Sequence, residues 1–206
     1  MTTQLSLYNQ ALFLLKEREL SSIATGSNRE ASQKKLDVIW DAGALDYCLS
    51  RALWNFATRT VESTYDSGVT PAFGLKRAHA KPSDWIKTAA ICTDEKFHYP
   101  CLDYRDKGEY WFSDYDTLYI EYVSNDSSYG GDLSLFPEDY EKFVASYLAK
   151  ELAGNLTGDF NIDDIKSEYR IKLDEARTND ASNQPTKFPA TGNWARARTS
   201  NRWRNR

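Results

Sequence analysis

Histidine, methionine and long apolar runs are scarce in this chain of 206 residues. It contains two His and one Met, so a nucleophile that needs a His base has few candidate partners. No apolar stretch approaches the roughly 18 residues that span a bilayer, and the mean hydropathy is -0.65. The N-terminus MTTQLSLYNQ has neither the basic nor the apolar region of a signal peptide. We therefore expect a soluble, non-enzymatic protein with no membrane segment.

Cysteine is also scarce, and its spacing excludes a disulfide framework. The three residues Cys48, Cys92 and Cys101 make an odd number, which favours reduced thiols. Cys92, His98 and Cys101 lie within ten residues, but no Cys-x-x-Cys pair accompanies them. The sequence also lacks a Gly-x-Ser-x-Gly elbow and a Gly-rich phosphate loop. We therefore predict no metal site, no cofactor and no catalytic residue.

Charge is present in both signs but is unevenly distributed, within a net charge of -4. Residues 177–206 carry seven Lys or Arg and one acid, whereas the preceding residues carry 19 basic and 29 acidic side chains. An acidic body followed by a basic end is more typical of a partner-binding protein than of an enzyme.

One long helix is predicted over residues 34–61, which contain no Pro and a single Gly, Gly43. At helical spacing this segment has two apolar stripes, and a helix with two such stripes must pack on both sides. The second stripe is predicted to contact either the rest of this chain or a neighbouring subunit. It consists of Trp40, Tyr47, Trp54 and Val61, which recur every seventh residue and are the candidate subunit-interface residues.

Three further helices are expected. The first covers about residues 4–20, with Thr2 or Thr3 as its cap. A strongly apolar stripe predicts another from Pro137 to near Gly154. The last is capped by Asn161 and loses its periodicity after Ala176.

The stretch between the second and third helices is predicted to be β-rich. Pro and Gly break any helix there, and aromatic residues are frequent. We predict short antiparallel strands over residues 102–104, 109–112 and 117–123, with turns at 105–108 and 113–116 and a flexible loop at 124–131.

These elements predict a mainly α-helical fold of the α+β class. It is a four-helix bundle core that carries a small antiparallel sheet between its second and third helices. The predicted domains are a helical bundle of residues 1–66 and 136–178, a β-rich insertion of residues 67–135, and an extended basic C-terminal arm of residues 179–206.

The C-terminal arm combines aromatic and cationic side chains on a segment that has no periodicity of its own. Trp and Arg anchor protein interfaces by filling pockets and pairing with carboxylates. A solubilising disordered tail is the alternative, although such tails usually lack aromatic residues. The candidate partner-binding residues are Lys187, Phe188, Trp194, Arg196, Arg198, Arg202, Trp203, Arg204 and Arg206.

Several of these stretches together resemble the head-to-tail adaptor proteins of tailed bacteriophages, the group that includes tail tubular protein A of short-tailed phages. The resemblance covers nearly the whole chain, and its patterns are of core and helix-end residues rather than catalytic ones. It is carried by LYNQALFLLKERELSSI, ALDYCLSRALWNFATRTV, DTLYIEYVSND, FPEDYEKFVASYLAKELAGNLTGD and YRIKLDEARTNDA.

The resemblance implies a structural virion protein at the head–tail interface, assembled in the host cytoplasm. Such adaptors form a ring, commonly of twelve subunits, beneath the portal protein ring. The ring supports the tail nozzle or tail tube, and genomic DNA passes through its channel without sequence-specific binding. Their C-terminal segments reach into the portal ring, so the resemblance makes the arm from Lys187 to Arg206 the portal-binding segment.

Two other functions stay open at this stage. A nucleic-acid-binding accessory protein would use the same Arg and Trp residues for phosphate contacts and base stacking. A small hydrolase within the insertion would depend on His79 or His98.

Overall fold

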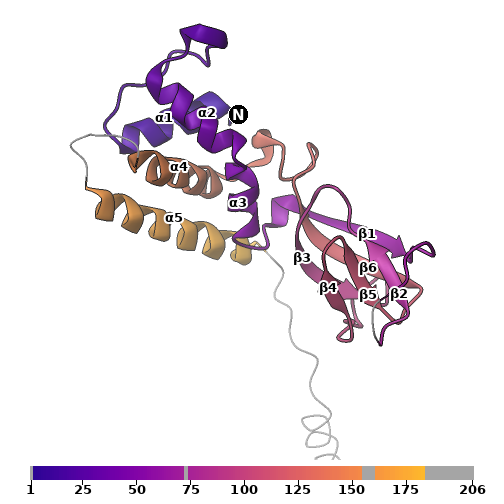
Figure 1. Cartoon of the computed structure of the whole chain (residues 1–206). Coiled ribbons are helices and arrows are strands. Elements are labelled where there is room, and N and C mark those ends of the chain that lie inside the picture. The colour runs from indigo at the N-terminus through magenta and orange to yellow at the C-terminus, as the bar shows by residue number, and fades with distance from the viewer. Residues whose placement is uncertain (1, 72–73, 155–160, 184–206) are drawn as a thin grey trace, which may run out of the picture.

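The computed structural model describes residues 2–71, 74–154 and 161–183, and these divide into two parts. Five α-helices gather in one part, which we call the helical body, and six strands form the other, which we call the β unit. Helix α3 lies between them, so the chain enters the β unit beside α3 and returns to the helical body at α4 (Figure 1).

The predicted four-helix bundle core is wrong. In the described residues the chain forms five α-helices and two three-stranded antiparallel sheets, which is a mixed α+β fold. Two departures account for the difference: the second predicted helix is broken, and the β unit contains strands that the sequence patterns did not indicate.

Helix α1 (Gln4–Leu14) begins where its cap predicts. Thr3 accepts a hydrogen bond from the backbone of Ser6, and Ser6 bonds back to Thr3, which forms a capping box. The helix ends six residues earlier than expected, because Lys16 takes a left-handed conformation with φ 56°. The chain then passes through a short 3-10 turn, η1 (Gly26–Asn28), to helix α2.

The single helix predicted over residues 34–61 is also wrong. Helix α2 (Ala31–Asp41) stops before Gly43, whose φ of 92° is left-handed and suits glycine. Helix α3 (Ala44–Ser50) is short and is followed by the 3-10 turn η2 (Asn55–Ala57). Strand β1 (Thr58–Thr64) then begins, because its run of β-branched side chains favours an extended backbone.

The last two helices agree with their sequence signals. Helix α4 (Glu138–Ala153) follows Pro137 and the 3-10 turn η3 (Leu133–Leu135). Helix α5 (Ile162–Ser182) is capped by Asn161, whose side chain accepts a hydrogen bond from the backbone of Asp163, and it runs past the predicted end. None of the described helices combines the length and apolarity that a membrane span requires.

The β unit consists of two antiparallel sheets. The first has the order β1-β6-β3, with β3 (Trp85–Cys92) and β6 (Thr117–Ser124). The second has the order β2-β5-β4, with β2 (Arg77–Ala80), β4 (Arg105–Lys107) and β5 (Tyr110–Ser113). Strand β6 pairs along its length with β1, where Val61 faces Ile120.

The strand predictions are confirmed in part. The segments 109–112 and 117–123 lie in or next to β5 and β6, as their alternation indicates. Residues 102–104 are not a strand, and β4 occupies the segment predicted as a turn. Strands β1, β2 and β3 were not predicted.

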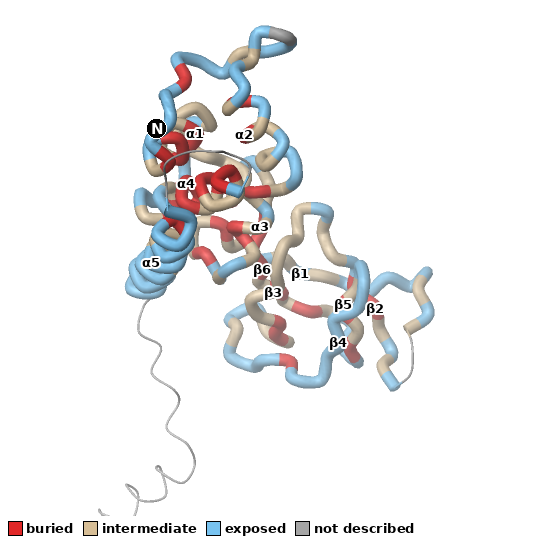
Figure 2. The backbone as a smooth tube through the Cα atoms, turned by 60° about the vertical axis from the view of Figure 1, so that its left-hand side comes forward, coloured by how far each residue is buried: buried red, intermediate tan, exposed pale blue. Residues whose placement is uncertain are grey.

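Each part has its own apolar core. Figure 2 shows buried positions along α1 and α4, while α5 lies on the outside and is mostly exposed. The core of the helical body is the larger one and includes Trp54, Tyr140 and Phe143. The smaller core of the β unit consists of Ile91, Cys101, Trp111, Leu118, Ile120 and Tyr122.

Candidate functional site

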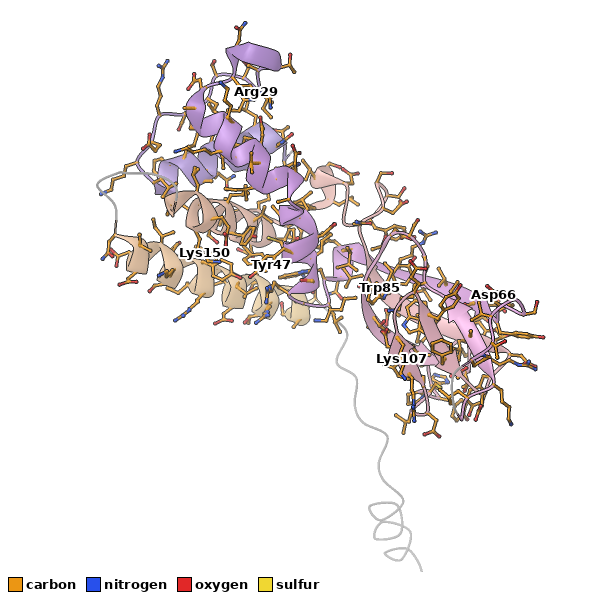
Figure 3. The ribbon with its side chains drawn as sticks, viewed as in Figure 1. Arg29, Tyr47, Asp66, Trp85, Lys107 and Lys150 are labelled. Carbon is orange, nitrogen blue, oxygen red and sulfur yellow. The ribbon has the colours of Figure 1, made fainter. Side chains whose placement is uncertain are left out.

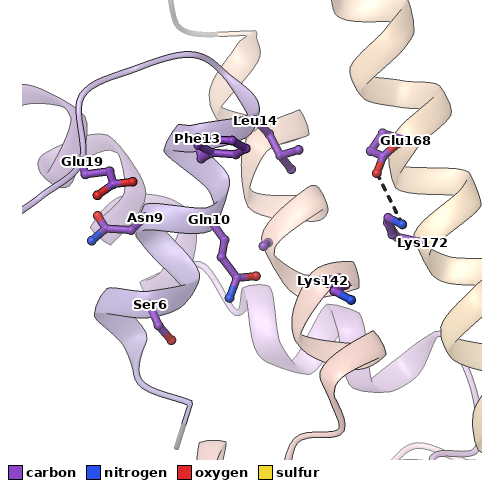
Figure 4. Close-up of a pocket in the computed structure, with 10 residues that line it drawn as sticks. Ser6, Asn9, Gln10, Phe13, Leu14, Glu19, Lys142, Glu168 and Lys172 are labelled. Atoms are coloured by element: carbon purple, nitrogen blue, oxygen red, sulfur yellow. Dashed lines mark ion pairs between the residues drawn. The ribbon is translucent and has the colours of Figure 1, made fainter.

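The helical body has an open, mainly apolar groove between α1 and α5. Both helices pack on α4, and Figure 4 shows α4 between them. The groove has a volume of about 600 Å³, and a second hollow of about 330 Å³ shares Leu14 and Glu168 with it. We call this surface the α1–α5 groove; its lining residues are Ser6, Asn9, Gln10, Phe13, Leu14, Glu19, Lys142, Ala145, Glu168 and Lys172.

One large apolar side chain in the groove is strongly exposed. Phe13 lies in the last turn of α1 and is 72% exposed. Leu14 and, from α4, Ala145 line the same groove. An aromatic side chain left in water at the edge of an apolar hollow is typical of a surface that binds another chain.

The cations of the groove are already paired. Lys142 donates to Glu138 at 2.6 Å, and Lys172 donates to Glu175 at 2.9 Å and lies 3.7 Å from Glu168 (Figure 4). Their charge is therefore largely neutralised within the groove.

The four predicted interface residues do not form a common face. Trp40 lies on α2 with its ring 5.8 Å from that of Tyr8, in an edge-to-face contact. Val61 is in β1, where it packs against the core of the β unit. Trp54 is 1% exposed and donates to the carbonyl oxygen of Cys48 at 3.1 Å. Buried Trp54 has no surface to offer a neighbouring subunit, and the supposed second stripe is an artefact of treating 34–61 as one helix.

Tyr47 belongs to an aromatic stack between α3, α4 and α5. Its ring lies 4.5 Å from that of Tyr147, and its hydroxyl is 3.3 Å from the hydroxyl of Tyr169. Lys150 lies 4.8 Å from the ring centre of Tyr169, and Figure 3 labels Lys150 and Tyr47 on these neighbouring helices. Burial raises the pKa of Tyr147 to about 12. The stack thus holds three helices together within one chain.

The predicted portal-binding residues, Lys187, Phe188, Trp194, Arg196, Arg198, Arg202, Trp203, Arg204 and Arg206, lie outside the described residues. The structure does describe the end of helix α5, which precedes them in the sequence. Helix α5 ends beside the junction with the β unit, where the side chain of Asp180 accepts from the backbone N–H of Asn55 at 3.1 Å. Arg177 donates to the carbonyl oxygen of Arg51 at 2.6 Å. Residues 184–206 of the C-terminal arm therefore follow an anchored helix end.

The helical body and the β unit are joined by polar contacts and close packing. Asn125 donates to Asp46 at 3.0 Å, and Lys87 donates to the carbonyl oxygen of Ser50 at 3.3 Å. A Cβ on Gly130 would lie 2.5 Å from the carbonyl oxygen of Ser124. Only glycine fits there, so the loop predicted as flexible is packed closely against the end of β6.

A partly buried polar network organises the β unit around Asp84. Its carboxylate accepts hydrogen bonds from Arg59 at 2.9 Å, Tyr122 at 3.1 Å and Ser124 at 2.5 Å. Burial of Asp84 opposes its ionisation, but the bonds from Ser124 and Arg59 outweigh it and lower the pKa of the carboxyl below its usual value. This charge ties β1 and β6 to the turn before β3.

The residues considered for a hydrolase do not form an accessible site. Ser113 Oγ lies 3.4 Å from His79 Nε2, but both residues are fully buried and substrate cannot reach them. His79 also has Nδ1 3.2 Å from the carbonyl oxygen of Ser63 and Nε2 3.1 Å from that of Tyr115. Burial lowers the pKa of its imidazole. His98 lies in an exposed loop.

The three cysteines are buried thiols. Cys48, Cys92 and Cys101 are buried and form no disulfide. The described ranges contain no group of three His, Cys, Asp or Glu side chains arranged to hold a metal ion. Burial raises the pKa of the Cys48 and Cys101 thiols, which makes them poor ligands and poor nucleophiles.

Sequence reasoning missed the α1–α5 groove, although a signal for it was present. The apolar stripe of the first helix contains Leu5, Tyr8, Leu12 and Leu15, and Phe13 lies outside it. An aromatic residue outside the buried stripe indicates an exposed side chain, which is one component of the groove. No protein-family model and no curated protein sequence matches this chain, so its resemblance to head-to-tail adaptors stands as a proposal.

Proposed function

We propose that this protein is a non-enzymatic structural adaptor of a tailed-phage particle, in which a ring of subunits joins the portal protein to the tail. The observation that carries the proposal is the C-terminal arm. Residues 184–206 contain six Lys or Arg, two Trp and no acid, and they follow a chain with an acidic excess. Such a segment suits a docking site with apolar pockets and carboxylates on a partner ring.

The anchored end of α5 supports this assignment. Since Asp180 and Arg177 are bonded to residues beside the β unit, the arm leaves from a fixed position on the subunit. A segment that becomes ordered only on its partner makes stable attachment depend on that partner being present. In an adaptor, attachment then waits for an assembled portal.

The two parts of the subunit suit contacts with two different partners. The helical body carries an open apolar groove, and the β unit carries exposed apolar side chains on its β3–β4 loop, where Leu102 is 84% exposed. We assign the portal to the arm and the tail nozzle or tail tube to another surface. Self-association gives the ring, for which we propose twelve subunits.

The acidic excess of residues 1–176 supports a DNA channel through that ring. A wall of the same charge sign as the polymer lets DNA slide without sequence-specific binding. The proposed location is the virion, at the head–tail interface, after assembly in the host cytoplasm. No cofactor is required for this function.

Portal binding tests the proposal. When purified portal rings are mixed with the full chain, electron microscopy should show portal rings that carry a second ring of this protein. A chain ending at Asn183 should give portal rings alone. Trp194→Ala with Trp203→Ala should weaken binding, whereas Tyr99→Ala with Leu102→Ala, a matched loss of exposed apolar side chains elsewhere, should leave portal binding unchanged. Full binding by the shortened chain would overturn the assignment of the arm.

A second function is favoured by the same composition: a nucleic-acid-binding accessory protein that uses the arm for phosphate contacts and stacking. It predicts that short duplex or single-stranded DNA binds without any protein partner and that affinity falls steeply with salt. Portal binding that persists at a salt concentration where DNA binding is lost would separate the two and favour the adaptor.

A further inference from the structure

The charges around the α1–α5 groove favour a positively charged occupant. Glu19 lines the groove, and Asp164 lines the adjoining hollow of about 330 Å³; both are exposed, and neither forms an ion pair within the part of the chain that the structure describes. Lys142 and Lys172 are held by glutamates, as described above. The carboxylates of the rim are thus left to attract a cationic segment.

The groove also calls for an aromatic or large apolar side chain. Phe13 and Leu14 line it, and a hollow of about 600 Å³ is large enough for a tryptophan side chain together with neighbouring residues. Aromatic rings stack or meet edge to face with energies of about 0.5–1.5 kcal/mol beyond their burial. An occupant with both Trp and Arg could pack against Phe13 and Leu14 and pair with the carboxylates of Glu19 and Asp164.

This chain contains such a segment. Residues 185–206 include Phe188, Trp194 and Trp203 among six cationic side chains and no acid. The positive charge and the aromatic side chains of this segment therefore both suit the groove. The rest of the chain has an acidic excess and does not.

The segment is long enough to reach the groove of its own chain. From Glu168 to Asn183, helix α5 covers about 22 Å at 1.5 Å per residue. Trp194 lies eleven residues beyond Asn183, a span of up to about 36 Å in extended chain. Tethering gives the segment an effective concentration of order millimolar near the groove, so even a weak contact would be occupied.

We propose that residues 185–206 dock in the α1–α5 groove of their own chain, with an aromatic side chain against Phe13 and Leu14 and arginines paired with Glu19 and Asp164. The docking goes beyond the proposed function and does not depend on it, because it concerns the chain without any partner. If the chain is an adaptor, portal and groove compete for the same segment.

Trypsin cleavage after Arg196 and Arg198 in the full chain tests the docking. Cleavage follows the population of the undocked segment, so it should be at least roughly tenfold slower in the full chain than in a synthetic peptide of residues 185–206. Mass spectrometry of the released fragments reports these two sites separately from all others.

Two variants test whether the α1–α5 groove is the surface that protects the segment from trypsin. Glu19→Lys with Asp164→Lys, or Phe13→Ser alone, should raise the cleavage rate toward that of the peptide. The matched control is Glu95→Lys with Asp103→Lys, which changes net charge equally on exposed residues of the β unit and should keep the protection. Thermal melting of each variant checks that the fold is retained.

Three outcomes would overturn the proposal. Equal cleavage rates in the full chain and the peptide would mean that the segment is undocked. Protection that the groove variants leave unchanged would place the segment elsewhere. Protection that grows over a roughly hundredfold rise in protein concentration would mean that a second copy supplies the segment; protection independent of concentration supports docking within one chain.

Discussion

The helical body and the β unit are stabilised in different ways. The core of the helical body is large and almost entirely apolar, with aromatic rings of Trp54, Tyr140 and Phe143 in mutual contact. The core of the β unit is small, and polar groups supplement it, among them the buried His79 and the partly buried Asp84. The comparison teaches that the same chain relies on packing in one part and on hydrogen-bonded charge in the other.

Trp54→Ala is the substitution expected to break the helical body. Its side chain fills the core against Tyr140 at 4.8 Å and Phe143 at 6.0 Å between ring centres. Removing it leaves a cavity and should lower the free energy of unfolding by about 3–5 kcal/mol. Urea denaturation measures this loss. Val38→Ala, at a side chain on α2 that is 69% exposed, should change it by less than about 0.5 kcal/mol; similar losses for both would refute the assigned burial.

Asp84→Ala is the corresponding test for the β unit. It leaves Arg59, Tyr122 and Ser124 without their acceptor, and we expect a loss of about 2–3 kcal/mol at neutral pH. Because the pKa of Asp84 is lowered by folding, its stabilising contribution is present above the unfolded pKa and is lost as pH falls through the folded one. The difference between wild type and variant should therefore shrink in acid.

A difference that stays constant from neutral pH to strong acid would contradict the charged network. The control is Asp103→Ala, an exposed carboxylate of the same unit, for which chemical denaturation should detect no change above about 0.5 kcal/mol.

His79 should make the stability of the β unit depend on pH in the range where histidine titrates. Burial lowers the pKa of its imidazole, so the folded state resists protonation. Its contribution to stability is present above the unfolded pKa of about 6.5 and is lost as pH falls toward the folded pKa, by at most about 1.4 kcal/mol per pH unit. Unfolding free energies measured between pH 7.5 and 5.5 report this slope.

His79→Gln should remove the part of the slope that belongs to His79. An unchanged slope in His79→Gln would show that another group is responsible.

Tyr140→Phe, in the core of the helical body, is the substitution with the smallest expected effect on stability. The Tyr140 hydroxyl is buried and has no hydrogen-bond partner in the described part of the chain. Its removal should leave stability unchanged or raise it by up to about 1 kcal/mol, because an unsatisfied polar atom leaves the core. Calorimetric melting measures the change. A loss of more than about 1 kcal/mol would mean that the hydroxyl is satisfied after all.

Local signals predicted the elements that depend on local contacts. Thr3 and Asn161 cap helices as expected, and Pro137 precedes α4. The alternation of residues 117–123 gave β6, the central strand of its sheet.

The rest depended on contacts between distant residues. Residues 58–64 continue an apolar period from the preceding helix, yet they pair with β6 at positions about 60 residues away, such as Val61 with Ile120. The helix over residues 34–61 was predicted from helical periodicity alone, which does not show that the chain turns at Gly43. The exposure of Phe13 could have been predicted from its place outside the buried stripe, but the groove itself depends on how α1 and α5 pack on α4, which no single helix records.

The attachment of Asp180 to Asn55 has a mechanical consequence. Any tension applied to the chain beyond Asn183 acts first on the last turn of α5, and from there on the backbone that enters β1. The load therefore reaches the chain at Asn55, between the buried Trp54 and the start of strand β1. A pull on the C-terminus is thus shared between the helical core and the first strand of the β unit.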